Sequence, residues 1–547
     1  MRYIGITIGP VIETLGLART PAGLWASSFL FSWLSRDLCA RIADAAGDPS
    51  AIISPCFTEE ESLKLKDGVG LFPDRIIAQT ALSLDQINTI IAEAKQSLAE
   101  TLFEAVGDAG AAAADLGTYQ NYFGALLRVR AVEFRTDGNP VLESSQLLSA
   151  IELEPQFSQA EPRNYLLELF ESPKAISQNT NVKDTVWKSF GIGDSWQLLS
   201  GASANDGPHG PPIRDLAHIA RGGAPATSEY KRSRYYAIVQ CDGDNVGLLL
   251  ERVGRFLEGR VQGKPGSDVS AILRDQFSKK LLEYSQRAAQ IVKNYGGVTL
   301  YAGGDDLLAI TPVFTADGQT ILDLAQSLNT EFQGALDLTQ ALEPEFQDMA
   351  LRTPTLSIGV AICYYKYPLY EALALARSML FDHAKHATLG DEGPVKDALA
   401  VSLVKHSGHA AAFVLPKFSQ TAVVERLEDL IAWQGDQRYD NPVRYYNSVE
   451  QHLSDLSPLF AEAMRTAKGA EDLAPLFGNV FDSSFHGPQL QPQLDSVREL
   501  LWLSKDHARS IDGSPPSADP AGSIDHSTAI HPLLQFVRFF SEKNKDD

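Results

Sequence analysis

The N-terminal part of the chain mixes short apolar runs with longer amphipathic segments. Residues 3–8 are rich in β-branched side chains and stop at Gly9-Pro10, which predicts a strand followed by a turn. Apolar positions at helical spacing predict amphipathic helices over residues 24–46, 83–106 and 119–132. This region is therefore expected to combine a strand with several helices.

The pattern becomes sharper after residue 234, where strand-like and helix-like segments follow one another. Strands are predicted over residues 235–241, 297–302, 307–311, 355–363 and 397–404. Helices are predicted over residues 246–257, 268–294, 318–338 and 369–386. The order strand–helix–strand–strand–helix–strand is that of the ferredoxin-like unit. Because crossover connections are right-handed, the first of these strands should lie beside the third and antiparallel to it.

Two stretches have a composition that does not support regular structure. Residues 191–229 are rich in glycine and proline, and are expected to form a surface connection near a domain boundary. A second loop-rich stretch, 511–525, separates a short amphipathic piece at 532–542 from the rest. Residues 410–510 have apolar positions at helical spacing and are expected to be mostly helical.

Length, charge and composition narrow the class of protein. A chain of 547 residues is expected to form about three or four domains. The apolar fraction of 44% and the charged fraction of 21% are typical of a globular protein and exclude fibrous and disordered classes. The formal net charge of −22 argues against binding bare nucleic acid through the bulk of the surface. Any contact with nucleic acid should be local or shared with a more basic partner.

The sequence also bears on location and on cysteine chemistry. Apolar stretches fall short of the roughly 18–20 residues that a membrane span needs, so no membrane contact is expected. Glu13 and the Gly9-Pro10 break argue against a secretory signal, and the chain is expected to be cytoplasmic. The four cysteines contain no CxxC spacing, which argues against a zinc ribbon and a disulfide framework.

Acidic residues gather at the ends of two predicted strands. Asp242 closes the first strand of the second half, and Asp305 and Asp306 follow Gly303 and Gly304 in the turn between the second and third strands. The predicted topology brings these carboxylates to one edge of one sheet. Like charges this close repel one another, and a hard divalent cation with oxygen ligands relieves the repulsion. The sequence therefore predicts a Mg²⁺ or Mn²⁺ site, completed by substrate phosphates and including Asp244 as a further candidate ligand.

The two glycines and the paired aspartates admit a functional and a plainer interpretation. Gly303 and Gly304 permit a turn that a Cβ would block, and they let a triphosphate approach the backbone. A two-metal site of this kind activates a 3′-hydroxyl and stabilises charge on the attacked α-phosphate. The alternative is a solvated hairpin turn, because glycine and aspartate are ordinary turn residues. The position of Asp242 on the matching edge favours the metal site.

Several motifs resemble a known family. The segments 242–247 (DGDNVG), 301–306 (YAGGDD) and 357–359 (SIG) resemble the nucleotide-cyclase palm of the large subunit of type III CRISPR effector complexes. The tract 364–372, with Ala384-Lys385 and 405–408, is similar to the Cmr-type (subtype III-B) branch. Residues 7–11, 18–20 and 24–32 resemble the first, degenerate palm of the same subunit. The likeness covers residues 1–45 and 233–410.

The resemblance implies a fold class and a division into domains. The fold would be α+β, with two ferredoxin-like palm domains (βαββαβ), an intervening helical region and a helical C-terminal domain. The division would be a first palm at 1–150, an intervening region at 151–230, the cyclase palm at 231–408 and the C-terminal domain at 409–547. Departures from the family are informative too. The chain has no histidine before His209 and no cysteine knuckle, so neither an HD-type nuclease nor zinc is expected.

The resemblance also implies an activity. The palm would join ATP molecules through 3′–5′ bonds into cyclic oligoadenylates, second messengers in antiviral defence, when guide RNA pairs with target RNA. Asp242, Asp305 and Asp306 would be the catalytic and metal-binding residues. Gly303, Gly304, Asn245 and Ser357 would lie near the nucleotide, and Lys385 near a triphosphate. The plainer alternatives are a solvent-facing lysine at Lys385 and a structural hydroxyl at Ser357.

Partners and competing functions follow from the same resemblance. The partners would be other subunits of the type III complex and ATP, with guide and target RNA held mainly through those subunits. One alternative is a non-catalytic scaffold subunit, which would not need an intact GGDD and Asp242. Another is a stand-alone cyclase like the GGDEF diguanylate cyclases. Leu307 follows the paired aspartates here, where that family has glutamate and phenylalanine.

Overall fold

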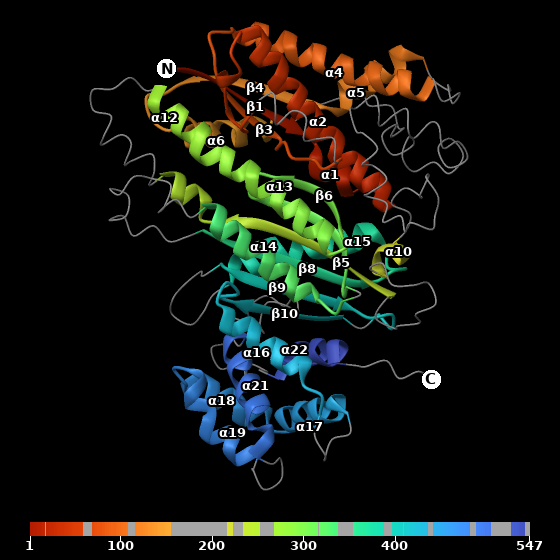
Figure 1. Ribbon diagram of the computed structural model, residues 1–547, viewed down its shortest axis with the longest axis vertical. Coiled ribbons are helices and arrows are strands. Elements are labelled where there is room, and N and C mark those ends of the chain that lie inside the picture. Colours follow the sequence, from red (N-terminus) through yellow and green to blue (C-terminus); the bar gives the residue numbers. More distant parts are fainter. Residues whose placement is uncertain are drawn as a thin grey trace.

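The computed structural model describes the chain in fourteen segments. They are residues 1–16, 18–57, 68–107, 115–154, 216–221, 234–251, 267–315, 317–336, 354–387, 396–408, 410–435, 441–481, 488–504 and 527–541. The predicted loop at 511–525 lies outside these segments, and so does the stretch 191–229 except for residues 216–221. In the described part, two sheets and a set of C-terminal helices follow one another along the long axis (Figure 1).

The first sheet belongs to the N-terminal part of the chain. Its four strands lie in the order β2-β3-β1-β4, and β1 is antiparallel to both of its neighbours. The elements alternate as strand, helix, two strands, helix and strand, which is the predicted ferredoxin-like order. Their bounds are β1 Arg2–Gly9, α2 Pro21–Ala46, β2 Ile52–Ser54, β3 Arg75–Gln79, α4 Leu84–Gly107 and β4 Arg128–Arg135.

Helix α2 has clear start and stop signals. The Thr20 side chain accepts a hydrogen bond from the Gly23 amide, and Pro21 occupies the first turn, where a missing N–H costs nothing. Gly47 ends the helix with φ of 69°, a left-handed backbone that glycine adopts without strain. Trp25 and Phe29 stack at 5.4 Å between ring centroids and are fully buried. These signals explain why the predicted end of this helix is confirmed.

The predicted helix over 119–132 is wrong in its second half. Helix α5 spans Leu116–Leu126, and β4 begins at Arg128. The segment 128–134 alternates charged and apolar residues, which suits a strand at the edge of a sheet. Leu127 is the single residue between α5 and β4, so the apolar positions of the helix are followed at once by those of the strand. In the sequence, this continuation imitates helical spacing beyond the end of the helix. Helices α1 Val11–Gly16 and α6 Pro140–Glu152 complete this region.

The second sheet has six strands in the order β10-β9-β8-β5-β7-β6. Strand β5 is antiparallel to β7, as predicted, and also to β8, while β9 runs parallel to β8. The four strands β8-β5-β7-β6 form the ferredoxin-like core of this sheet, and β9 and β10 extend it. The bounds are β5 Tyr235–Asp244, β6 Val298–Gly303, β7 Asp306–Pro312, β8 Thr355–Tyr364, β9 Ala398–Val404 and β10 Ala410–Pro416.

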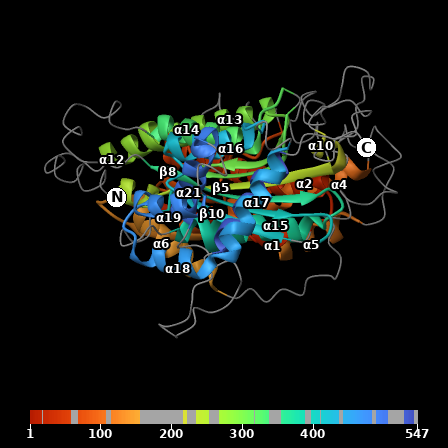
Figure 2. The same ribbon diagram turned by 90° about the horizontal axis from the view of Figure 1, so that it is seen from below.

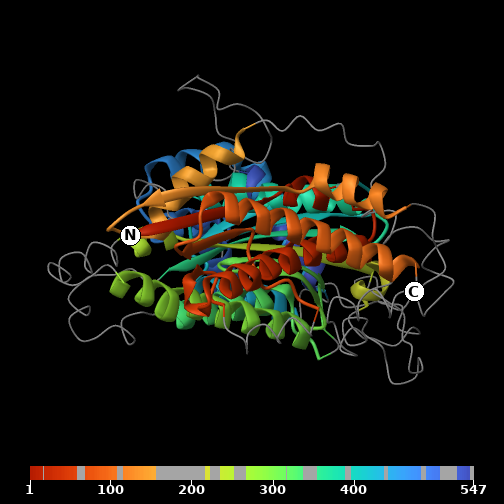
Figure 3. The same cartoon turned by 90° about the horizontal axis from the view of Figure 1, so that it is seen from above.

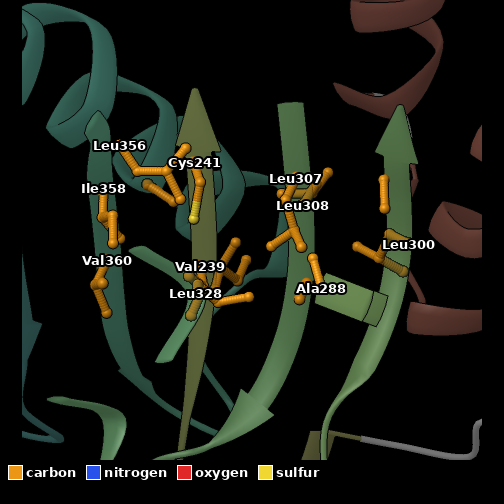
Figure 4. Close-up of a cluster of buried hydrophobic side chains, with 14 of the residues drawn as sticks. Val239, Cys241, Ala288, Leu300, Leu307, Leu308, Leu328, Leu356, Ile358 and Val360 are labelled. Atoms are coloured by element: carbon orange, nitrogen blue, oxygen red, sulfur yellow. The ribbon is translucent and has the colours of Figure 1, made fainter. Parts of the chain in front are cut away.

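Helices cover both faces of the second sheet. On one face, α13 (Lys279–Asn294) and α14 (Ile321–Leu336) pack their apolar sides on the sheet. Figure 4 shows Ala288 and Leu328 among side chains from β5, β6, β7 and β8. On the other face, α15 (Leu369–Ser378) lies against β8. A Cβ at Gly359 would lie 2.4 Å from the Leu380 amide nitrogen, so glycine is what permits this close approach. Irregular turns continue α15 as far as His386.

The C-terminal segment is helical except for its first strand. The helices are α16 Thr421–Ala432, α17 Pro442–Asp455, α18 Ser457–Thr466, α19 Ala474–Val480, α21 Gln491–Ser504 and α22 Ser527–Ser541. Residues 410–416 were expected to be helical and instead form β10, because β9 offers a paired edge to a wholly apolar run. The view from below shows these helices in front of the second sheet (Figure 2).

Hydrogen bonds join the first sheet region to the second. The Tyr3 and Ser270 hydroxyl groups lie 2.9 Å apart, and the Ser278 hydroxyl donates to the Ile53 carbonyl at 3.0 Å. The Asn139 side chain donates to the Leu250 carbonyl at 3.1 Å. Figure 3, the view from above, shows the N-terminal helices lying over the second sheet. In the described part of the chain, no helix is both long and apolar enough to cross a membrane.

Candidate functional site

The predicted carboxylates meet at one edge of the second sheet. Cys241 on β5 pairs with Leu307 on β7, so Asp242, one residue further along β5, lies opposite Asp306 at the start of β7. Asp305 precedes Asp306 in the turn after β6, where Gly304 has φ of +70°. A residue that has a side chain is strained in this left-handed backbone conformation. We call Asp242, Asp305 and Asp306 the acidic edge.

Asp305 packs directly on the backbone of β5. A Cβ added at Gly243 would lie 2.7 Å from Asp305 Oδ2 and 2.8 Å from Asp305 Cβ, closer than atoms tolerate. The glycine that follows Asp242 therefore makes room for the second carboxylate. This contact explains why the motif has glycine between its two aspartates, a point that the sequence alone did not reveal.

The acidic edge concentrates negative charge, which Lys385 offsets only in part. Desolvation, together with repulsion from the neighbouring Asp242 carboxylate, raises the pKa of Asp305 to about 6. Desolvation also raises the pKa of Asp306 well above its ordinary value, with Asp305 and Asp242 adding to the shift. Repulsion between the carboxylates, which the sequence predicted, contributes to both shifts, but burial is their larger cause.

Lys385 is the cation that faces Asp242. Its ammonium forms an ion pair with the Asp242 carboxylate and another with Asp244 Oδ1 at 2.8 Å. It also donates to the backbone carbonyls of Asp242 at 2.9 Å and Gly243 at 2.7 Å. Burial alone would lower the pKa of Lys385, but the two carboxylates outweigh it and raise the pKa. The lysine is therefore bound into the end of β5 and is not a solvent-facing helix residue.

Asp244 does not join the acidic edge. Its side chain is fully buried, and its carboxylate accepts hydrogen bonds from the hydroxyls of Ser357 at 2.9 Å and Thr355 at 3.0 Å. The Asp397 amide donates to it at 2.8 Å, in addition to the Lys385 ion pair. A carboxylate with this many donors is already stabilised without a metal. We therefore correct the prediction that Asp244 is a metal ligand.

Ser357 supplies a structural hydroxyl group, which was the alternative to a position near the nucleotide. It lies on β8 opposite Asp242 in the strand register, and its hydroxyl is fully buried against Asp244. It therefore supports a buried carboxylate rather than lining the site. Strand pairing decides this outcome, because Ser357 and Asp244 are far apart in the sequence.

A pocket of about 440 Å³ opens beside the acidic edge. Asn245 lies on its wall with φ of 61°, a left-handed backbone that asparagine adopts more readily than most residues. Three lining residues were missed from the sequence, Leu248, Phe381 and Lys396, because none belongs to a recognisable motif. The other lining residues are Asp242, Gly243, Val246, Gly247, Asp305 and Lys385.

The residues of the acidic edge fit a divalent cation shared with a substrate. Among the described residues, no group of three or more histidine, cysteine, aspartate or glutamate side chains is arranged to hold an ion by itself. Mg²⁺ is usually held by one or two carboxylates and completed by phosphate oxygens and water. Burial and repulsion between the carboxylates raise the pKa values of Asp305 and Asp306, although Lys385 acts on Asp305 in the opposite direction. The arrangement therefore suits an ion that arrives with a nucleotide.

Comparisons with known proteins match both regions of the chain. The family model described as "Cas10/Cmr2, second palm domain" matches residues 235–399. The model described as "CRISPR-associated protein Cmr2, N-terminal" matches residues 3–107. The N-terminal match falls on the first sheet region and the palm match on the second, in the order that the sequence motifs indicated.

Individual relatives agree with the family models. The CRISPR system Cmr subunit Cmr2 of Pyrococcus furiosus is 32% identical over 192 residues, which cover 32% of this chain and 19% of that protein. The match thus spans about a fifth of the curated relative. A chain from the apo state of a type III-B Cmr-beta complex has a similar fold, with a TM-score of 0.56 and 12% identity over 99% of this chain and 82% of that one. A chain from Cmr-beta bound to cognate target RNA has a TM-score of 0.50 and 11% identity, covering 99% and 83%.

Proposed function

The chain belongs to the Cas10/Cmr2 family, and we propose that its second palm joins ATP molecules into cyclic oligoadenylates. One observation carries the proposal. Asp242, Asp305 and Asp306 converge at one sheet edge, beside a pocket that is large enough for a nucleotide. A carboxylate cluster of this kind next to a pocket is the usual design of a metal-dependent nucleotidyl transfer site.

The residues of the chain have separate roles in this proposal. Asp242, Asp305 and Asp306 would hold Mg²⁺ or Mn²⁺, which supplies activation of a 3′-hydroxyl and stabilises charge on the α-phosphate. Gly303 and Gly304 shape the turn that presents the last two carboxylates. The bonds from Lys385 fix the Asp242 carboxylate and the end of β5, so the acidic edge is oriented before substrate arrives.

Asn245 completes the proposed nucleotide site. It follows β5 directly, lines the pocket and is exposed. Its amide can donate to and accept from a base, a ribose or a phosphate. Ser357 is not part of this site, because its hydroxyl faces Asp244 in the interior.

We also propose that the chain works inside a multi-subunit complex. The similar solved chains come from Cmr-beta assemblies, one of them bound to cognate target RNA. A net charge of −22 makes this chain a poor ligand for RNA by itself, so guide and target RNA would be held mainly by partner subunits. Synthesis would then start when the guide RNA pairs with its target.

The test is product formation by the assembled complex. We expect cyclic adenylates when the complex is incubated with ATP, Mg²⁺ and matching target RNA, and none above background without target RNA. The variant Asp305→Ala/Asp306→Ala should assemble normally and form no product. Products are separated by liquid chromatography and identified by mass.

Three outcomes would overturn the proposal. Equal product from the double variant would remove the acidic edge from the reaction. An inactive wild-type complex that still binds target RNA would favour the non-catalytic scaffold. A homodimer that is active without RNA would favour a stand-alone cyclase of the GGDEF kind.

A further inference from the structure

The pocket needs a cation for nucleotide phosphates that Lys385 does not supply. An ammonium group has three N–H donors. Lys385 already faces four oxygen acceptors, which are the Asp242 and Asp244 carboxylates and the Asp242 and Gly243 carbonyls. Binding a phosphate would require it to release a buried partner. A different basic side chain is therefore needed near the phosphates.

Lys396 is the other lysine that lines the pocket, among the residues the structure describes. It is partly exposed, and its backbone has φ of 52°, followed by Asp397 with φ of 39°. Two consecutive left-handed residues that are neither glycine nor asparagine are uncommon. Such a conformation persists only where the surroundings hold it, and it occurs often at ligand sites. The left-handed backbone of Lys396 therefore coincides with its position on the pocket wall.

Hydrogen bonds on both sides hold this backbone. The Lys396 amide donates to the Ala387 carbonyl at 3.3 Å, and the Asp397 amide donates to the buried Asp244 carboxylate at 2.8 Å. The Ser419 amide donates to the Asp397 carboxylate at 2.9 Å, and its hydroxyl donates to the same group. Asp397 thus links the fixed end of β5 to the turn after β10. It is well placed to act as a positioning residue for Lys396.

The rest of the pocket wall fits a nucleotide. Leu248 and Phe381 are large apolar residues, 48% and 37% exposed, and both line the pocket. Exposed aromatic and aliphatic side chains in a pocket offer a surface for a flat base. The pocket therefore presents three features that suit a nucleoside triphosphate. The apolar wall matches the base, and the acidic edge matches the phosphates that carry the metal ion. The lysine matches the phosphate charge that the metal ion does not neutralise.

We propose that Lys396 binds the triphosphate of ATP and that Asp397, through Asp244 and Ser419, holds it in position. This inference rests on the proposed function, because it assigns a residue to the same nucleotide site. Lys396 contacts substrate phosphates, while Lys385 remains an internal partner of the carboxylates. The contribution of Lys396 to ATP affinity is thus specific to the phosphate charge and independent of the base.

The test is equilibrium binding of ATP, AMP and adenosine to the full chain, with and without Mg²⁺. Lys396→Ala should weaken ATP binding roughly 10- to 100-fold, the effect of losing a charge-assisted hydrogen bond. Adenosine binding should stay within about twofold, and Lys396→Arg should restore most of the ATP affinity. Lys417→Ala is a matched control, because Lys417 also has a left-handed backbone, with φ of 56°, and does not line the described pocket.

A second variant separates binding from folding. Lys396→Gly should raise the thermal unfolding midpoint, because glycine adopts the left-handed backbone without strain, and should still weaken ATP binding. Unchanged ATP affinity in Lys396→Ala would overturn the inference and leave the proposed function standing. Equal losses for ATP and adenosine would also overturn it, since they would indicate a general disturbance of the pocket. A wild-type chain that binds no ATP either alone or in the assembled complex with target RNA would contradict the proposed function itself.

Discussion

The two sheets share a strand order but differ at the matching edge. In the second sheet this edge carries Asp242 opposite Asp306, with Asp305 beside them. In the first sheet the corresponding pair at the end of β1 is Thr7 opposite Arg75. The first edge therefore has a cation where the second has a carboxylate.

The first sheet neutralises its edge with its own side chains. Arg75 forms a two-pronged ion pair with Glu152 at the end of α6, at 2.8 and 3.1 Å, and the Thr7 hydroxyl donates to the same carboxylate at 2.6 Å. At the acidic edge of the second sheet, by contrast, the aspartates outnumber the lysine that faces them. The shared strand order thus does not determine the chemistry of the sheet edge. A few residues at the strand ends determine it.

The largest effect is expected at the acidic edge itself. Asp242→Ala removes a proposed metal ligand and should lower cyclic adenylate formation on the order of 10²- to 10³-fold, typical for losing electrostatic support of a transition state. The measurement is the initial rate of product formation by the assembled complex with saturating target RNA.

The matched control lies on the first sheet. Arg75→Ala breaks the Arg75–Glu152 pair and should leave the rate within about twofold, because Arg75 pairs with Glu152 and lies outside the acidic edge. A loss comparable to that of Asp242→Ala would break the comparison, since both edges would then take part in the reaction.

A smaller effect should separate the buried ion pair from the exposed one. Asp244→Ala leaves Lys385 without its fully buried partner and should destabilise the fold by about 3–5 kcal/mol. Glu152→Ala removes a pair whose side chains are about one-third exposed, and should cost about 1 kcal/mol or less. Urea-induced unfolding of the full chain measures both. Equal losses would show that Asp244 is no more important to folding than a surface carboxylate.

The smallest effect is a pH dependence that comes from Asp397, the residue just before β9. Burial raises the pKa of Asp397 to about 6, so the folded chain binds a proton that the unfolded chain has already lost. Stability contributed by this group should therefore fall as pH rises from about 4 to about 6, and then stay constant. Asp397→Asn should make that slope shallower in thermal unfolding, while keeping a carbonyl acceptor for the Ser419 amide. The remaining slope comes from other carboxyl groups with raised pKa values, such as Asp305. A variant whose stability falls with pH as steeply as the wild type would contradict this assignment.

Local patterns predicted most of the fold. Alternating or wholly apolar runs bounded by turns located β5, β7 and β8, and the crossover rule placed β5 antiparallel to β7. The predictions failed where the local pattern was ambiguous. β10 begins with three alanines, which favour helix, and only pairing with β9 makes it a strand.

The site was predicted less completely than the fold. The spacing of Asp242 and the paired aspartates was enough to bring them to one edge, because each lies at a strand end. The roles of Asp244 and Ser357 depend on which face of each strand is buried and on which residue of the neighbouring strand lies opposite. No local sequence pattern carries that information. Lys396 belongs to no motif, and its left-handed backbone follows from contacts made by distant residues.

Helix α22 has a consequence for how the sequence can change. Phe539 packs on Tyr235, the first residue of β5, with ring centroids 5.0 Å apart, and Phe536 packs on Phe413 of β10 at the same distance. A bulkier or smaller ring at one member of such a pair leaves a clash or a void at the other. In evolutionary terms, α22 and β5 therefore cannot change their contacting side chains independently. Substitutions at Phe539 and Tyr235 are expected to be inherited together.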